Sequence, residues 1–318
     1  MIELIKHLKN DKGQAVVFVA LLMLLFMAAG AIVVDVALTM VAKEKLQQGL
    51  DAGALAGTME LYDQPANAFA VAQEYLLNNV PGLDSYSINN RPTKAGLKLW
   101  GEKDLHFFFA PLLGFSSGTV SGVSVAEIGA VSSVIGAAPL AIEQHNFDYD
   151  DPYILKQSPN GFSFETYLGA GNFGALSLGG GGASKYEENL KYGFRQLLAV
   201  GDVVATETGN ISGATRRGVD FLLQQCDHDP ACTYSSFKPG CPRILLVPVY
   251  KEVEILSGQI KQVEVVGFAS FFISEVSGTG VNNQIIGYFV KSFAAGTTGV
   301  DVPDFGLKTV RLVKGDNQ

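Results

Sequence analysis

Hydrophobic residues dominate one unbroken stretch near the start of the chain. From Gly13 to Val34 no residue carries a charge, and all except Gly13, Gln14 and Gly30 are apolar. As an α-helix these 22 residues would be roughly 33 Å long, about the thickness of the hydrocarbon layer of a bilayer. Buried helices of soluble proteins seldom run this long without a charge, so the pattern predicts a transmembrane helix.

The helical pattern continues beyond this stretch. Apolar or small residues recur every three or four positions along one stripe, while charged residues occupy the other faces. The first proline of the chain is Pro65, so nothing interrupts the helix before it. We therefore expect one continuous transmembrane and extended helix over residues 14–61. The stripe consists of Leu38, Ala42, Leu46, Leu50, Ala54, Gly57 and Leu61.

Three glycines, Gly49, Gly53 and Gly57, lie four residues apart beside this stripe. Each interior glycine costs a helix about 1 kcal/mol relative to alanine. Their spacing therefore predicts that another helix or a sheet packs closely against this face. The alternative is that the helix frays here. The sequence does not say whether the partner lies in the same chain or in a second copy, so helix–helix self-association stays open.

A cleaved secretory signal is the alternative to a retained membrane helix. Small-x-small sequences occur at 29–31 and 54–56, but the first lies inside the apolar stretch and the second well beyond it. The stretch also exceeds the usual apolar core of a signal peptide. We therefore expect the helix to stay attached to the chain. Three lysines precede it, which predicts a cytoplasmic N-terminus (residues 1–13) and an extracytoplasmic remainder in a single-pass protein of the cell membrane.

Beyond the helix, strand-like and turn-like segments alternate, and the pattern predicts an α+β fold with a mostly antiparallel sheet. A small α+β subdomain over 62–138 would begin with a short helix over 65–79, and we expect Phe107–Phe109 and Leu112–Leu113 to be core. A larger β-rich domain would cover 139–318. Its predicted helices are 185–200 and 213–226, and its predicted strands are 243–250, 262–275, 284–293 and 306–314. Residues 263–273 are apolar on both faces, as in a central buried strand.

The charge balance argues against nucleic acid as a partner. The chain has 23 basic and 31 acidic residues, a formal net charge of −8. Binding to phosphates requires a positive face that releases counterions, and five of the basic side chains lie in the first 45 residues.

Several sequence elements over residues 12–57 keep a recognisable order. Lys12 and Gly13 precede the apolar span, Asp35 ends it, and a charged helix leads to a small-residue run, Asp51-Ala52-Gly53-Ala54-Leu55-Ala56-Gly57. This segment resembles the N-terminus of the TadE/TadG-like proteins of the Tad (Flp-type) pilus system. The resemblance implies a non-enzymatic envelope protein that takes part in assembly or anchoring of a thin pilus. It also implies the membrane and other pilus-assembly or envelope proteins as partners, and no cofactor.

Later regions, 171–193 with 206–223 and 241–250 with 263–273, look like extracytoplasmic parts of TadG-like proteins. The chain also departs from the family. Prepilin-like members have a glutamate five residues after the cleavage-site glycine, where this chain has Phe18. Some TadG-like chains contain a domain with an Asp-x-Ser-x-Ser metal motif, which this sequence lacks. We therefore assign no metal-dependent adhesion site.

The strongest glycine motif does not indicate a cofactor. Gly169, Gly171 and Gly174 satisfy G-x-G-x-x-G, but dinucleotide binding needs a helix directly after such a turn. The four glycines at 179–182 oppose a helix there, so we expect a surface loop.

The three cysteines, Cys226, Cys232 and Cys241, fall within sixteen residues. Outside the cytoplasm this clustering predicts a disulfide, with Cys226–Cys241 as the favoured pair and one cysteine left over. A zinc site from the three cysteines and His228 is the alternative, although Cys-x-His-x3-Cys-x8-Cys is not a standard zinc spacing. The histidines form no pattern with a serine or cysteine nucleophile, and we assign no catalytic residue and no metal site.

The sequence therefore predicts a structural, pilus-associated envelope protein. The alternative is a surface adhesin or receptor whose outer domain binds a ligand independently of a pilus.

Overall fold

The computed structural model describes residues 11–91, 95–156, 174–207, 211–256, 259–278, 283–299 and 301–314. The chain folds into two compact units. The first comprises Met1–Ile128 and Val310–Gln318, and the second comprises Gly129–Thr309. The sequence pattern did not reveal that C-terminal residues join the first unit. Whether segments 62–138 and 139–318 fold independently stays a prediction.

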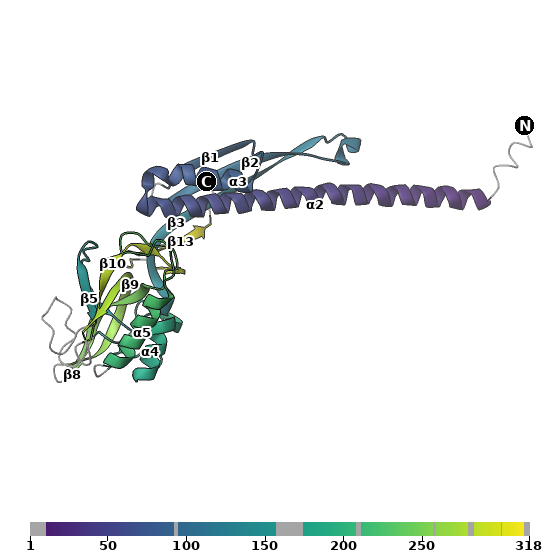
Figure 1. Cartoon of the computed structure of the whole chain (residues 1–318). Helices are drawn as coiled ribbons and strands as arrows, with labels where there is room; N and C mark the ends of the chain where they lie inside the picture. Colours follow the sequence, from purple (N-terminus) through teal and green to yellow (C-terminus); the bar gives the residue numbers. More distant parts are fainter. Residues whose placement is uncertain are drawn as a thin grey trace, which may run out of the picture. The chain divides into compact units, whose positions relative to one another are not determined.

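One helix, α2 (Asp11–Asp63), dominates the first unit (Figure 1). It runs for 53 residues, which confirms the continuous helix predicted from the pattern. A short 3-10 helix, η2 (Pro65–Asn67), follows, and α3 (Ala68–Asn79) then packs back against α2. The shared core lies on the predicted stripe. It includes Leu46, Leu50 and Ala54 of α2, Ala68, Ala72 and Leu76 of α3, and Leu97 and Leu99 of the adjoining sheet.

Three antiparallel strands complete this core: β1 (Ser85–Asn90), β2 (Gly96–His106) and the first part of β3 (Ser117–Ala137). β2 and β3 form a long hairpin that extends beside α2 (Figure 1). A 3-10 helix, η3 (Ala110–Leu113), forms the tip of the hairpin. It ends at Gly114, whose φ of 94° lies in the left-handed region that glycine adopts without strain.

A buried carboxylate attaches the C-terminal strand to the first unit. Glu127 of β3 is 5% exposed and forms ion pairs with Arg91 and Arg311. Arg311 lies in β13 (Leu307–Val313), and its Nη2 is 2.6 Å from Glu127 Oε1. A buried charge is costly to desolvate unless it is paired, so these guanidinium groups allow Glu127 to stay inside.

The second unit is built on a mixed, mostly antiparallel sheet, in which the main strands follow the order β3-β8-β9-β10-β5. The predicted fold class, an apolar N-terminal helix followed by a mostly antiparallel α+β region, is confirmed. The long strands are β5 (Pro152–Lys156), β8 (Ile244–Leu256), β9 (Gln259–Ser277) and β10 (Gln284–Val290). The short strands are β4 (Ile142–Glu143), β6 (Phe194–Ala199), β7 (Val203–Ala205), β11 (Ser292–Phe293) and β12 (Gly296–Thr298).

Strand β9 is the centre of this sheet, as its doubly apolar pattern predicted. It pairs with β8 on one side and β10 on the other. Side chains on both of its faces are buried, because one face packs under helices and the other under loops and short strands. The buried residues are Val263, Val265, Val266, Phe268, Phe271, Phe272 and Ile273.

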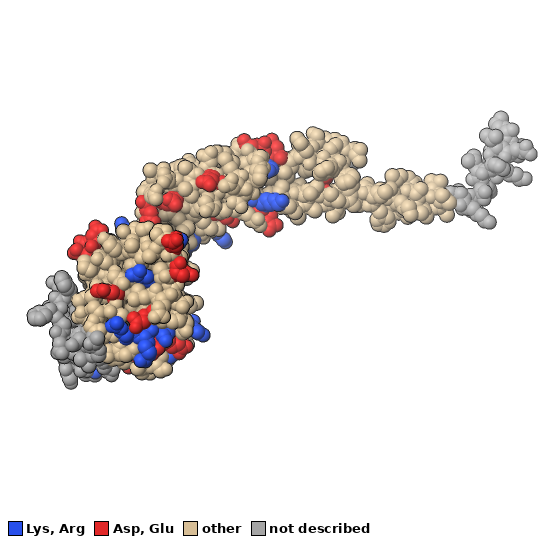
Figure 2. All heavy atoms as spheres, viewed as in Figure 1, with Lys and Arg blue, Asp and Glu red and all other residues tan. Residues whose placement is uncertain are grey.

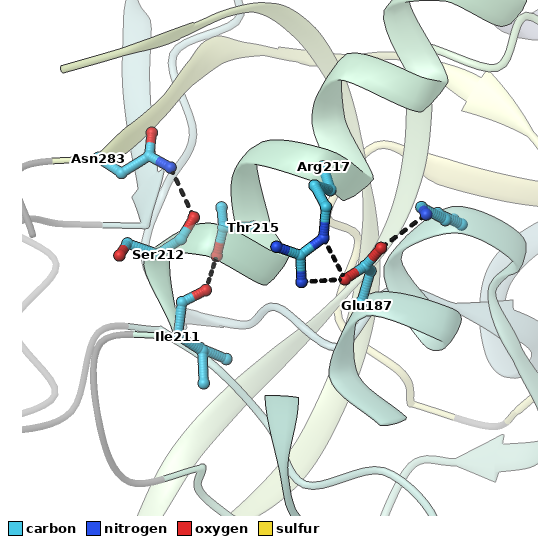
Figure 3. Close-up of polar contacts among 7 residues, drawn as sticks. Glu187, Ile211, Ser212, Thr215, Arg217 and Asn283 are labelled. Carbon is cyan, nitrogen blue, oxygen red and sulfur yellow. Dashed lines mark hydrogen bonds and ion pairs between the residues drawn. The ribbon is translucent and has the colours of Figure 1, made fainter. Parts of the chain in front are cut away.

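Two helices, α4 (Ala183–Tyr192) and α5 (Ser212–Gln225), pack together through Tyr186, Leu190 and Val219. Glu187 links them: it accepts a hydrogen bond from Arg217 Nε at 2.8 Å (Figure 3) and one from Lys191 Nζ at 2.6 Å. These hydrogen bonds, first that from Arg217 and then that from Lys191, lower the pKa of Glu187 below its ordinary value.

The predicted helix over 185–200 is wrong in its second half. α4 ends at Tyr192, and β6 begins at Phe194. Gly193, at φ 74°, turns the chain between them, and a Cβ there would lie 2.6 Å from the backbone of Gly136. The segment that follows is short and apolar, and such segments fit a strand as well as a helix.

Candidate functional site

The first part of α2 exposes an apolar surface on all sides. From Ala15 to Val34 no side chain is buried by the rest of the protein, and Phe26 is 72% exposed. Figure 2 shows this part of the helix without charged side chains. In the part of the chain that the structure describes, α2 alone is long and apolar enough to cross a membrane, with a mean hydropathy of 2.9 over its most apolar window. An exposed apolar surface of this extent marks a membrane or a binding partner rather than water.

Asp35, the carboxylate at the end of the apolar stretch, is buried against the hairpin tip. It accepts three hydrogen bonds from backbone N–H groups: Phe108 at 2.9 Å, Phe109 at 2.9 Å and Ala110 at 2.7 Å. These donors lie at the start of η3, where N–H groups have no partner within the helix. A negative charge suits that position because the aligned N–H groups present partial positive charge. Asp35 therefore fixes the hairpin tip to α2 within its exposed apolar surface, which continues beyond Asp35 to Val41.

The hairpin tip itself carries exposed apolar side chains. Phe108 is 74% exposed, Leu112 is 85% exposed and Phe115 is 66% exposed. The prediction that Phe107–Phe109 and Leu112–Leu113 belong to the core is therefore wrong for Phe108, Phe109 and Leu112. Phe107 is partly buried, and the side chain of Leu113 lies outside the described part of the chain. Pro111 and Gly114 were the available signal, since both mark a turn and a turn lies at the surface.

The predicted close packing at Gly49, Gly53 and Gly57 has its partner within the chain. A Cβ on Gly53 would lie 2.7 Å from the carbonyl oxygen of Ala72, and one on Gly57 would lie 2.6 Å from the Cβ of Ala72. A Cβ on Gly49 would overlap the side chain of Val80. The absence of side chains lets α3 approach α2 this closely. Since α3 covers this face, the structure gives no support to self-association through these glycines.

The remaining residues of the small-residue run lie on the same part of α2. Ala54 is fully buried in the shared core, and Ala52 and Ala56 are partly buried. Asp51 accepts a hydrogen bond from Gln47 Nε2 at 2.8 Å, and the same amide donates to the carbonyl of Val123 in β3 at 3.1 Å. These contacts give the run a role in packing. Gly13 lies in the first turn of α2.

Comparison with known families identifies this segment. Residues 13–72 match the family described as "Putative Flp pilus-assembly TadE/G-like". The TadE/TadG-like resemblance is therefore confirmed over these residues. The match contains the apolar span, Asp35 and the whole contact between Gly53, Gly57 and Ala72. It connects the chain with Flp pilus systems, and the family is one of pilus assembly rather than an enzyme family. No curated protein and no solved structure matches the chain.

The cysteines, which lie outside the TadE/G-like segment, do not form the predicted disulfide. Cys226, Cys232 and Cys241 are all free, and the sulfurs of Cys226 and Cys241 are 3.5 Å apart, compared with about 2.05 Å in a disulfide. The structure instead brings all three thiols together with the imidazole of His228. These are the four residues that the sequence analysis gave as the zinc-site alternative to a disulfide.

The glycine motif at 169–174 lies, except for Gly174, outside the described residues. The glycines at 179–182 are followed by α4, which begins at Ala183. Three of them have positive φ, as a tight surface turn requires.

Proposed function

We propose that this chain is a non-enzymatic, single-pass membrane component of a Flp-type pilus assembly system. Its N-terminus would lie in the cytoplasm, and the chain that follows the apolar stretch would lie outside it. One coincidence carries the proposal: the segment that matches the TadE/G-like family is the segment that holds the exposed apolar surface of α2. The twelve Leu, Ile, Val and Phe residues of that surface favour insertion by roughly 4–7 kcal/mol in total.

The boundary of the bilayer would lie close to Asp35. Lipid would cover residues 15–34, and the exposed aromatic tip of the β2–β3 hairpin would enter the interface beside them. Two observations support this placement. The hydrogen bonds to Asp35 hold the tip against the end of the charge-free segment of α2, and the tip exposes further apolar side chains, Phe108, Leu112 and Phe115. Interfaces favour aromatic side chains, which makes lipid headgroups a suitable environment for the tip.

The surfaces available to pilus-assembly or envelope partners would be those of the two units outside the bilayer. The glycine face of α2 is already occupied by α3. A partner helix would therefore meet α2 within residues 15–34, inside the membrane.

Replacement of the membrane segment tests this proposal in cells. Residues 15–34 are exchanged for an unrelated apolar helix of equal length, and a second strain lacks residues 11–34, the part of α2 that lies outside the shared core. The protein is then localised by fractionation with and without detergent, the position of each end is read from reporter fusions, and pili are counted by electron microscopy. We expect the strain without residues 11–34 to lose both membrane attachment and pili.

Normal piliation in the strain without residues 11–34 would refute the assembly role. If ligand binding at the cell surface disappears in that strain while pili persist, the adhesin alternative is correct. If the intact protein is soluble without detergent, the membrane anchor is wrong.

A further inference from the structure

The loop that follows α5 gathers four side chains that typically bind metal ions. Cys226, His228, Cys232 and Cys241 each present one ligand atom, and all four atoms lie within 4.8 Å of one another. The Cys226 and Cys241 sulfurs are 3.5 Å apart. His228 Nδ1 is 3.8 Å from the sulfur of Cys226 and 3.1 Å from that of Cys232. The four ligand atoms therefore surround one common point, as the ligands of a metal ion do.

These separations fit a tetrahedral zinc ion. With Zn–S bonds of about 2.3 Å and a Zn–N bond of about 2.0–2.1 Å, tetrahedral angles place the ligand atoms about 3.6–3.8 Å from one another. Two of the separations, 3.5 and 3.8 Å, lie close to these values, and the third, 3.1 Å between His228 Nδ1 and the sulfur of Cys232, is shorter. A disulfide would use two of the three cysteines and leave one thiol without a role, whereas a zinc ion uses all three and the imidazole.

We propose that Cys226, His228, Cys232 and Cys241 form a structural zinc site of the Cys3His type. All four coordination positions are filled by protein ligands, so the ion has no open position for a substrate. With three thiolates and a neutral imidazole, the loaded site carries a net charge of −1.

The surroundings of the cluster are built to hold the loop in place. Cys232 and Cys241 are buried against Phe272 of β9 and Val290 of β10, while Cys226 and His228 are partly exposed and leave a route for the ion. Arg243 donates to the carbonyl of Cys232 at 3.1 Å and to that of Ile273 in β9 at 2.9 Å. Its guanidinium group also places a positive charge beside the anionic site, and such outer contacts typically orient metal ligands.

A zinc ion would give this loop a cross-link in addition to the packing of Tyr234 and Phe237 against the sheet. Between the end of α5 at Gln225 and the start of β8 at Ile244 it forms no helix or strand, only one bridge between Thr233 and Ser236. Loops of this length without secondary structure are uncommon unless something holds them. Zinc at the cluster would attach both ends of the loop and its middle to each other, over the centre of the sheet.

The test measures metal and thiols on the full-length protein in detergent, isolated from membranes without chelator. Metal is determined by plasma mass spectrometry, and the cysteines are alkylated before and after chelation and located by peptide mass spectrometry. We expect one zinc per chain and alkylation of all three cysteines only after the metal is removed. Refilling with Co²⁺ is expected to give the visible bands of a tetrahedral cobalt–thiolate site.

Substitutions then assign the ligands. His228→Ala and Cys232→Ser are expected to lower zinc affinity by more than the 10- to 100-fold that typically follows loss of a supporting contact. His145→Ala removes an exposed histidine of the same unit outside the cluster and is expected to leave the metal content unchanged. The cobalt spectrum of the unsubstituted chain keeps the test decisive if a cysteine variant does not fold.

Three results would overturn the proposal. A metal-free protein with a disulfide and one reactive thiol would establish the disulfide instead. A metal-free protein with three reactive thiols that gives no cobalt–thiolate spectrum would show a cluster without affinity. Full zinc content in both ligand variants would place the metal elsewhere.

Discussion

Replacing Asp35 with alanine should release the tip of the β2–β3 hairpin from α2 without unfolding the first unit. The carboxylate accepts hydrogen bonds from the backbone N–H groups of Phe108, Phe109 and Ala110, and alanine offers them no acceptor. The hydrophobic core of the unit lies further along α2, around Leu50 and Ala54, and does not depend on these hydrogen bonds. The effect is therefore expected to stay local.

The magnitude follows from the three hydrogen bonds. A hydrogen bond to a charged group typically contributes about 1.5–3 kcal/mol. Water can reach the exposed tip and replace part of the lost interaction, and neighbouring hydrogen bonds are not additive. We therefore expect the free energy of local opening to fall by about 2–4 kcal/mol. At about 1.4 kcal/mol per factor of ten, amide exchange at the tip should accelerate by about 30- to 700-fold.

Hydrogen exchange followed by mass spectrometry, with the full chain in lipid nanodiscs, measures this effect on peptides that cover 107–113. Asp35→Asn keeps one acceptor oxygen and should give an intermediate rate. Asp63→Ala, an exposed aspartate at the far end of the same helix, is the control and should change nothing at the tip. Unchanged exchange at 107–113 in Asp35→Ala would refute the role of the carboxylate. An equal loss of protection throughout the first unit would show that Asp35 supports the whole unit instead.

Three further predictions concern packing, pH and lipid contact. Gly53→Ala should destabilise the first unit by about 1–3 kcal/mol in thermal unfolding, because its Cβ would lie 2.7 Å from the carbonyl of Ala72, although alanine favours the helix itself. Glu187→Gln should lower stability by about 1 kcal/mol at pH 7, a value kept small because Arg217 is exposed. Its lowered pKa makes this contribution complete above the unfolded pKa near 4.3 and lost as the pH falls through the folded pKa, so wild type and variant should converge in acid. Leu112→Trp, in a Trp100→Phe background, should be quenched by brominated lipids because the tip lies in the interface.

Two of these predictions have a matched control variant on the same chain, and the third is checked by its pH dependence. Gly30→Ala adds a Cβ that meets nothing within 4 Å, so equal destabilisation by Gly30→Ala and Gly53→Ala would contradict the packing argument. A stability difference for Glu187→Gln that does not shrink in acid would assign its effect to packing rather than to charge. Phe69→Trp in α3 is the reference for lipid quenching, and equal quenching at positions 69 and 112 would contradict insertion of the tip.

The helix and the sheet were predictable from the sequence because their signals are periodic and local. A few residues of local sequence are enough to predict whether each element is exposed or buried. This holds for the apolar stretch, for the stripe through Leu46 and Leu50, and for β9, which is apolar on both faces. The glycine at position 53 predicted a closely packed neighbour. Which element that neighbour is depends on where the chain returns after Pro65. That information is tertiary and cannot be read from the spacing of the glycines.

The contacts of Asp35 and of the cysteine cluster could not be predicted for the same reason. Asp35 meets residues more than seventy positions away, and the sequence indicated only that a carboxylate ends the span. Phe108 was assigned to the core because hydrophobic residues are usually buried, a rule that fails at a turn beside an apolar surface. The spacing of His228 and the cysteines fits no standard motif, so only their convergence in space indicates a metal site.

The two attachments along α2 explain how a membrane anchor can also hold a folded unit rigidly. Lipid burial retains the helix but is non-directional, so it does not fix the unit outside to the helix inside. The hydrogen bonds at Asp35 are directional, and the packing at Gly53 brings α2 and α3 into close contact; at 1.5 Å per residue the two positions lie about 27 Å apart on one helix. With one attachment the hairpin could rotate relative to α2, whereas two separated attachments oppose that rotation. If pilus assembly requires force to pass between the outer unit and the membrane, Asp35→Ala should impair piliation while the protein stays in the membrane fraction. An unrelated apolar helix joined directly to an intact Asp35 should preserve both, because the rigid connection begins at that residue and not within the lipid.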